Sequence, residues 1–227
     1  MSDGIPQDGK LTIGTRRYSS WSLRGWLPVR LAGLDVAEQV IPLAGGVTPG
    51  LKAISPGGTV PYLEHQGARI WESLAIAEYC AEFLPALWPA ERIARAHARA
   101  IAGEMHAGFR ELRMAMPMSL FRPDAAGTCL TEGAAADIAR IQAIWANTRT
   151  AFGQSGPYLF GAAFTNADAM YAPVVCRLLT YRPPLTPAAQ TYCDAIRAHP
   201  LVEQWYAEAG LEPAAWHLEK YESAPAS

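Results

Sequence analysis

Two short segments of the chain carry groups that suit an amino-acid or peptide ligand: Val60-Pro61 and Glu72-Ser73. Glu72 supplies a negative charge for an ammonium group. Ser73 lies where a helix is expected to begin, and the backbone N–H groups there favour an anion such as a carboxylate. A carboxylate and an amine together form the head group of an amino acid. Taken alone, Glu72-Ser73 would be an ordinary helix cap, but its spacing from Val60-Pro61 favours a ligand site.

Pro61 follows a Pro-Gly-Gly turn at residues 56–58. It is expected at the first position of a strand, because proline cannot donate to a sheet ladder. This position makes Val60-Pro61 a candidate for a cis peptide bond. At such a step the backbone N–H and C=O of Val60 point outward and can pair with an extended ligand as one more strand.

The elements that would position these groups form a mixed α/β half. Apolar runs predict strands over residues 10–15, 36–42 and, as a hairpin, 60–71. Apolar periodicity predicts helices over residues 22–32, 51–54 and 73–84. The first strand–helix–strand unit is expected to place its two strands parallel. The order of elements is therefore βαβ followed by ββα.

The second half of the chain is predicted to be all helical. The segment PALWP, residues 85–89, interrupts the alternation of strands and helices, and helical periodicity follows from Glu91 onward. One long helix is predicted over residues 91–115, and Thr165 with Asp168 forms a capping-box pattern before an apolar run. We therefore divide the chain into a flexible lead-in, an α/β domain, a linker and an all-helical domain, over residues 1–9, 10–84, 85–90 and 91–227.

The composition excludes several classes of partner. A net charge of −2 over 227 residues disfavours a nucleic-acid partner and a basic membrane-binding face. No apolar run approaches the roughly 18 residues that span a bilayer, and the polar N-terminus is neither a signal nor a transit peptide. Four cysteines without metal-ligand spacing are typical of a reduced, cytoplasmic protein with no metal site: Cys80, Cys129, Cys176 and Cys193. His65 and His97 are predicted to be surface residues without partners.

The segment SPGGTVPYL, residues 55–63, followed by WES, residues 71–73, resembles the glutathione-binding half of the soluble glutathione transferase family. The resemblance implies an α/β plus all-α fold, with an N-terminal thioredoxin-like βαβ-ββα domain followed by a C-terminal helical bundle. It implies glutathione as co-substrate, bound along Val60, Pro61, Glu72 and Ser73. It also implies a homodimer and a cytoplasmic enzyme.

In the resembled family, the loop after the first strand supplies a tyrosine, serine or cysteine that hydrogen-bonds the glutathione sulfur. A free thiol, with a pKa of about 8.5, is only a few per cent thiolate at neutral pH, so a donor aimed at the sulfur favours the charged form. The segment SSWSLR, residues 19–24, resembles the zeta-class signature S-S-C-S-x-R of maleylacetoacetate isomerases. On this resemblance Ser19 matches the catalytic serine and Arg24 the conserved arginine, while Trp21 stands in place of cysteine.

Other assignments of the hydroxyls in this loop remain open. Tyr18, Ser20 or Ser22 is the sulfur donor in the alternatives, and the serines are also favoured simply as helix caps. The loop holds no cysteine, which excludes thiol-transferase chemistry through a mixed disulfide. The substitution of Trp21 for cysteine bears on the isomerase reaction and leaves thiol activation intact.

The second substrate of the resembled family binds between the two halves, above the sulfur. Candidate residues for this pocket are Met105, His106, Phe109 and Arg110, together with the segment from Met114 to Phe121. Methionine and phenylalanine suit an apolar electrophile, and Arg110 or Arg113 suits a carboxylate. In the alternative interpretation, Met105 and Phe109 belong to the core, and His106 and Arg110 are solvated.

The sequence therefore predicts a glutathione transferase that adds the thiolate to a small, largely apolar electrophile. An isomerase of the maleylacetoacetate type uses the same thiolate for addition and elimination, and peroxidase activity is a further use of it. A non-catalytic module with the same fold is the alternative from a different class. The intact set of Ser19, Glu72 and Ser73 favours the enzyme.

Overall fold

The computed structural model of the protein describes residues 8–123 and 125–223. Its first part holds four strands and three α-helices: β1 (Gly9–Gly14), α1 (Ser20–Leu31), β2 (Val36–Ile41), α2 (Leu51–Ile54), β3 (Tyr62–His65), β4 (Ala68–Trp71) and α3 (Ser73–Phe83). The sheet order is β2-β1-β3-β4. β1 pairs parallel with β2 and antiparallel with β3, and β3 pairs antiparallel with β4. The predicted thioredoxin-like layout is confirmed, although most of the predicted lead-in, residues 1–7, lies outside the described residues.

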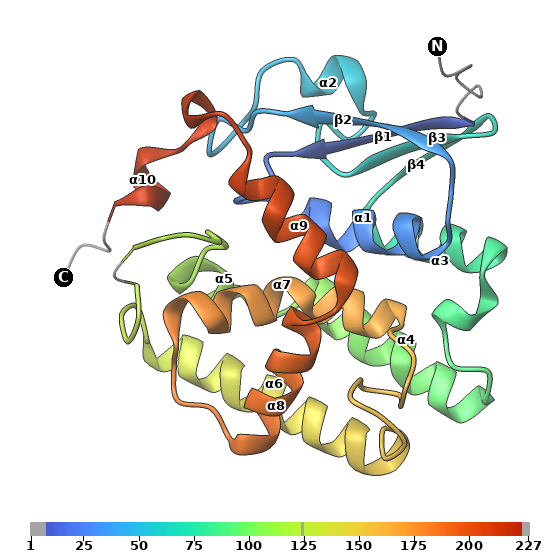
Figure 1. The fold of residues 1–227 in the computed structure, drawn as a ribbon, viewed down its shortest axis with the longest axis vertical. Helices are drawn as coiled ribbons and strands as arrows, with labels where there is room; N and C mark the ends of the chain where they lie inside the picture. Colours follow the sequence, from blue (N-terminus) through green and yellow to red (C-terminus); the bar gives the residue numbers. More distant parts are fainter. Residues whose placement is uncertain (1–7, 124, 224–227) are drawn as a thin grey trace.

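Helices cover both faces of this sheet (Figure 1). α1 and α3 lie on the face turned toward the C-terminal helices, and α2 lies on the opposite face (Figure 1). The peptide bond between Val60 and Pro61 is cis, as predicted. Pro61 packs closely on α1, because a Cβ atom added to Gly25 would lie 2.6 Å from Pro61 Cγ. Glycine at this position therefore allows the loop before β3 to approach the first helix.

In the second part, every regular element of the described residues is a helix, as predicted. It contains η1 (Pro85–Leu87), α4 (Arg92–Ala107), α5 (Arg110–Ala115), α6 (Glu132–Phe152), α7 (Asn166–Tyr181), α8 (Pro187–Arg197), α9 (Pro200–Gly210), η2 (Ala214–Trp216) and α10 (Glu219–Glu222). α7 is the central helix and is buried along most of its length. The predicted capping box at its start is present, with Thr165 and Asp168 bonded to each other's backbone N–H groups. The Asp168 carboxylate also accepts hydrogen bonds from the Leu159 N–H and the Tyr192 hydroxyl.

The prediction of one helix over residues 91–115 is wrong, because the chain turns between α4 and α5. Phe109 adopts φ = 59°, in the left-handed region, and ends the regular hydrogen-bond ladder. The side chain of Arg113 reaches back and donates hydrogen bonds to the carbonyls of Met105 and Gly108 at the end of α4. The break is therefore stabilised by a side chain that the apolar periodicity does not include.

The prediction that His65 and His97 are surface residues without partners is also wrong. His65 is buried, and its Nδ1 lies 2.9 Å from the Tyr79 hydroxyl. His97 is half-buried, and its Nε2 lies 2.9 Å from Thr148 Oγ1. Tyr79 lies on α3 and Thr148 on α6, each in a different element from its histidine, so the local sequence around the histidine does not predict the contact.

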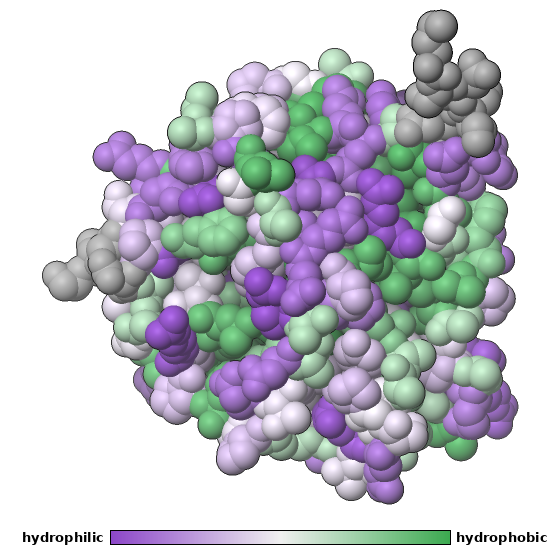
Figure 2. All heavy atoms as spheres, viewed as in Figure 1, coloured by the Kyte–Doolittle hydropathy of each residue, from purple (hydrophilic) through white to green (hydrophobic). Residues whose placement is uncertain are grey.

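Polar and apolar side chains are interspersed over the face of the molecule shown in Figure 2. In residues 8–123 and 125–223, no helix is long and apolar enough to cross a bilayer. Over the same residues, no group of three or more histidine, cysteine, aspartate or glutamate side chains could hold a metal ion. The four cysteines are free thiols.

Candidate functional site

Two adjoining cavities lie at the N-terminal end of α1. The first, of about 310 Å³, is lined by Trp21, Thr59, Val60, Pro61, Glu72, Ser73 and His106. The second, of about 440 Å³, is lined by residues 18–21, 58–60 and parts of the segment 43–52. Trp21, Thr59 and Val60 line both, so the two cavities adjoin, and together they are referred to below as the groove. The structure thus brings the predicted binding residues and the predicted sulfur-donor loop together.

The end of the groove at α3 offers two polar side chains, Ser73 and Glu72, that suit the carboxylate and the ammonium group of an amino acid. Ser73 is the first residue of α3 and is buried, and its Oγ has no hydrogen-bond partner among the described residues. Glu72 is exposed and adopts φ = 76° and ψ = 126°, a costly conformation for a residue with a side chain. This conformation holds the Glu72 carboxylate beside the N-terminus of α3. A carboxylate ligand can accept from Ser73, and an ammonium group can donate to Glu72.

Val60 forms the wall between the two cavities. It lies one residue before the buried Pro61 and two before the start of β3. Within the described residues, no hydrogen bond engages the backbone N–H or C=O of Val60. These groups can therefore pair with an extended ligand in the groove.

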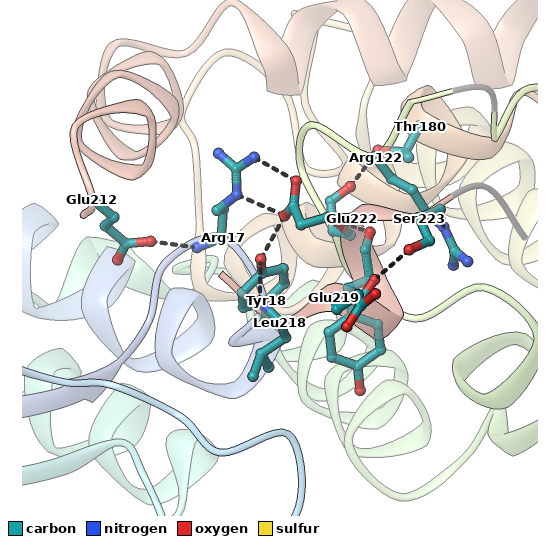
Figure 3. A network of polar contacts seen from close by, with 11 residues as sticks. Arg17, Tyr18, Arg122, Thr180, Glu212, Leu218, Glu219, Glu222 and Ser223 are labelled. Atoms are coloured by element: carbon teal, nitrogen blue, oxygen red, sulfur yellow. Dashed lines mark hydrogen bonds and ion pairs between the residues drawn. The ribbon is translucent and has the colours of Figure 1, made fainter. Parts of the chain in front are cut away.

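The Tyr18 hydroxyl is engaged by the C-terminal segment, residues 214–223. It donates to Glu222 Oε1 at 2.5 Å and accepts the Leu218 N–H at 3.0 Å. Figure 3 shows the Glu222 carboxylate between Tyr18 and the guanidinium of Arg17. Burial and the hydrogen bond to Glu222 raise the pKa of Tyr18 to about 12. The hydrogen of this hydroxyl is thus directed away from a ligand in the groove.

The three serines at the start of α1 have different partners. Ser19 is the N-cap, and its Oγ accepts the Ser22 N–H at 3.2 Å and donates to Ser22 Oγ at 2.7 Å. Ser22 Oγ in turn accepts the Gly14 N–H at 2.9 Å and lies inside the structure. Ser20 Oγ accepts a hydrogen bond from Nη2 of Arg177, on α7, at 3.2 Å. Ser19 and Ser20 both line the groove, close to the positive end of the α1 dipole.

Three arginines with little exposure lie beneath this end of the groove. The guanidinium carbons of Arg24 and Arg113 lie 5.0 Å and 4.8 Å from the ring centre of Trp21. Nη1 and Nη2 of Arg24 are buried and have no hydrogen-bond partner among the described residues. Burial, together with the charges of Arg113 and Arg177, lowers the pKa of Arg24. Burial lowers the pKa of Arg177 to about 10, which leaves it a cation at neutral pH.

Two residues near the groove are not assigned to the sulfur end of the site by the sequence: Arg113 and Arg177. Arg177 is the single charged residue in the apolar run 169–179, and a lone charge in a buried helix is a signal of function. The sequence predicts Arg113 only as a possible carboxylate ligand. Its contact with Trp21 depends on the turn at Phe109, which the sequence pattern did not predict.

The four residues predicted for the second-substrate pocket differ in burial and in whether they line the groove. His106 lines the first cavity, and its Nε2 lies 3.4 Å from Glu72 Oε2. Burial lowers the pKa of His106, although the charge of Glu72 opposes this effect. Met105 is completely buried and Phe109 nearly so, whereas Arg110 is exposed and lines neither cavity. Of the four, His106 alone faces the groove among the described residues.

Comparisons with known proteins agree with this geometry. The family model described as "Glutathione S-transferase, N-terminal domain" matches residues 18–82. A protein of Caenorhabditis elegans named "Probable maleylacetoacetate isomerase" is 31% identical over 163 residues, which cover 70% of this chain and 74% of that protein.

Solved structures share the fold across both parts of the chain. A glutathione transferase homologue from a Burkholderia strain, BGR1, solved with bound glutathione, has a TM-score of 0.69 at 23% identity, covering 90% of this chain and 99% of its own. A theta-class glutathione S-transferase from Xanthomonas axonopodis pv. citri, with glutathione bound, has a TM-score of 0.62 at 23% identity, covering 92% and 99%. Together with the curated relative, these matches confirm the prediction of a glutathione transferase-like enzyme with glutathione as co-substrate. The chain belongs to the glutathione S-transferase family.

Proposed function

We propose that this enzyme binds glutathione along Val60, Pro61, Glu72 and Ser73, and adds its thiolate to a small, largely apolar electrophile. The observation that carries the proposal is that these four residues and the start of α1 line one groove. The free backbone of Val60 pairs with the extended tripeptide. Ser73 and the N-terminus of α3 hold a carboxylate, and Glu72 holds the ammonium group.

In this arrangement the sulfur lies over the N-terminus of α1. The hydroxyl of Ser19 or of Ser20, the positive end of the α1 dipole and the buried cations beneath Trp21 favour the thiolate over the thiol. Each unit by which the thiol pKa falls corresponds to about 1.4 kcal/mol. Several such groups acting together supply a thiolate at neutral pH.

The test of the binding mode is calorimetric titration with glutathione of the parent, Ser73→Ala and Ser55→Ala. Ser55 is the matched control, because its Oγ is also buried without a partner in the described residues, but it lines neither cavity. We expect Ser73→Ala to weaken binding about tenfold, since one charge-assisted hydrogen bond is lost, and Ser55→Ala to bind as the parent does. Equal binding by all three proteins contradicts this assignment of Ser73.

An isomerase of the maleylacetoacetate type is the second candidate, favoured by the name of the 31% identical relative. Addition and elimination of the same thiolate would catalyse cis–trans isomerisation without consuming glutathione. Steady-state assays distinguish the two reactions, because conjugation consumes glutathione stoichiometrically and isomerisation does not. A non-catalytic binding module would bind glutathione without lowering the pKa of its thiol.

We also propose a cytoplasmic homodimer. Large apolar side chains are exposed on β4, α3 and α4, and a second copy of the chain would cover them: Trp71, Phe83 and Ile93. Light scattering of the parent, Phe83→Arg and Leu211→Arg tests this arrangement. Leu211, exposed at the end of α9, is the control. A dimer that Phe83→Arg dissociates and Leu211→Arg leaves intact supports the proposal, and a monomeric parent refutes it.

A further inference from the structure

We propose that Ser20 donates the hydrogen bond to the glutathione sulfur, and that Arg177 is a positioning residue that polarises the Ser20 hydroxyl. This inference rests on the proposed function, because it names the donor for the thiolate in the same groove. It differs from the prediction drawn from the zeta-class resemblance, which assigns that role to Ser19.

The hydrogen-bond partners of the two hydroxyls distinguish them. A serine hydroxyl has one hydrogen to donate and two lone pairs to accept with. The Ser19 hydrogen lies in the 2.7 Å contact with Ser22 Oγ, and one Ser19 lone pair accepts the Ser22 N–H. Ser19 is therefore committed to the N-terminus of α1.

Ser20 has the opposite arrangement. Its partner among the described residues is Arg177, whose guanidinium can only donate. The Ser20 hydrogen therefore has no acceptor within the described protein, although Ser20 lines the groove. A hydroxyl that accepts from a cation becomes a stronger donor, because hydrogen bonds in a chain polarise one another. A thiolate above Ser20 supplies the missing acceptor.

Arg177 is held in place by the central helix. It is 4% exposed, and its Nη1 donates to the Pro173 carbonyl at 3.1 Å. No carboxylate forms an ion pair with it among the described residues, and its Nε is buried without a partner. A buried cation without a counter-ion is strongly unfavourable. An anion bound at Ser20 would offset part of that cost, so binding of the thiolate and burial of Arg177 support each other.

Other charged and titratable groups also face Arg177. Its charged and titratable neighbours are Arg24 on α1, Arg113 on α5, Cys176 and Tyr181 on α7, and Tyr221 on α10. Burial raises the pKa of Cys176 and Tyr181, which stay neutral at neutral pH. His106, across the groove beside Trp21, has a lowered pKa. It therefore titrates on the acid side of its ordinary range.

The experiment measures the thiol pKa of bound glutathione, from the ultraviolet absorbance of the thiolate and from the pH profile of kcat/KM with a chloronitrobenzene. We expect Ser20→Ala to raise this pKa by about one unit, a tenfold loss of thiolate stabilisation. Ser20→Thr keeps the hydroxyl and should restore the parent value. Ser19→Ala should lower thermal stability, because it removes a helix cap, and leave the thiol pKa unchanged.

The role of Arg177 is tested by comparing the thiol pKa of its variants with that of Ser20→Ala. Arg177→Met should raise the thiol pKa by about as much as Ser20→Ala, and Arg177→Lys, which keeps the charge, should restore part of the shift. The double variant Ser20→Ala/Arg177→Met should show a shift smaller than the sum of the two, because the residues act in series. If Arg177→Met does not fold, Ser20→Ala, Ser20→Thr and Arg177→Lys decide the question.

The outcomes separate this inference from the proposed function. A lowered thiol pKa in the parent that Ser19→Ala raises and Ser20→Ala does not would overturn the inference and leave the proposed function standing. Additive shifts in the double variant would overturn the role of Arg177. A parent that binds glutathione with the thiol pKa of the free tripeptide would overturn the proposed function itself.

Discussion

At the scale of single residues, hydrogen-bond partners decide what a side chain can do. Tyr18, Ser19 and Ser20 are consecutive, and each carries a hydroxyl at the same groove. The first donates to Glu222 in the C-terminal segment, the second caps α1, and the third accepts from a buried guanidinium. Residue type alone does not distinguish the three hydroxyls as donors to the sulfur.

Glu222 links the C-terminal segment to the groove, and this contact should depend on pH. Its hydrogen bond from Arg17 lowers the pKa of the Glu222 carboxyl, and the bond from Tyr18 adds to this effect. A lowered pKa in the folded state stabilises the fold above the ordinary carboxyl pKa of about 4.3 and loses that effect as pH falls through the lowered value. Glu222→Gln should therefore cost about 0.5–1.5 kcal/mol of unfolding free energy at neutral pH and almost nothing in acid.

Chemical denaturation of the parent, Glu222→Gln and Glu219→Gln across this pH range measures the effect. Glu219 is a matched control on the same short helix, since no ion pair or hydrogen bond engages its carboxylate among the described residues. A difference between Glu222→Gln and the parent that is the same in acid as at neutral pH would contradict the prediction.

The backbone conformation of Glu72 should lower the stability of the protein, whereas its carboxylate should strengthen glutathione binding. Its φ of 76° suits glycine, whereas a residue with a side chain adopts it at a cost of about 1–3 kcal/mol. Glu72→Gly should therefore be more stable than Glu72→Gln by about 1 kcal/mol, while both should bind glutathione more weakly than the parent because the carboxylate is gone. Thermal unfolding and calorimetric titration of the three proteins give both quantities. Tighter binding by either variant would exclude Glu72 as the ammonium ligand.

At the scale of elements, local patterns predict what local contacts determine. The cis Val60-Pro61 step and the capping box of α7 follow from neighbouring residues, and both predictions are confirmed. The turn at Phe109 depends on Arg113, and the Ser20 contact depends on Arg177, 157 positions away. Apolar periodicity continues across the turn at Phe109, and it carries no information on the contact between Ser20 and Arg177. For this reason the strands, most of the helices and the glutathione motifs could be predicted from the sequence, and the packing of Arg24 and Arg113 against Trp21 could not.

Asp168 holds the start of the central helix and should be the most sensitive capping residue. Its carboxylate is completely buried and accepts hydrogen bonds from Thr165, Leu159 and Tyr192. Asp168→Ala leaves these donors buried without an acceptor and should lower the unfolding free energy by about 3 kcal/mol. Denaturation of this variant beside Glu132→Ala, on the exposed first turn of α6, measures the difference. A loss below about 1 kcal/mol would mean that water satisfies the donors.

At the scale of the whole molecule, the two predicted domains share one interior. α1 packs on α7, and a single hydrophobic cluster contains residues from both parts of the chain. Buried hydrogen bonds also cross between the parts. Among them, Arg24 Nε donates to the Met170 carbonyl at 2.8 Å, and Asn166 Nδ2 donates to the Ala77 carbonyl at 2.9 Å. We infer that the boundary proposed at residues 85–90 separates two architectures that unfold together.

Calorimetric unfolding of the chain should therefore show one transition, with equal calorimetric and van't Hoff enthalpies. Asn166→Ala removes the donor to the Ala77 carbonyl and should cost about 1–3 kcal/mol. At about 2–4 °C per kcal/mol for a chain of this size, the whole transition should move down by several degrees without splitting. Gln154→Ala, on the exposed loop after α6, should leave Tm unchanged. Two transitions in the parent, or a shift confined to one part of the endotherm in Asn166→Ala, would show that the groove lies between domains that open independently.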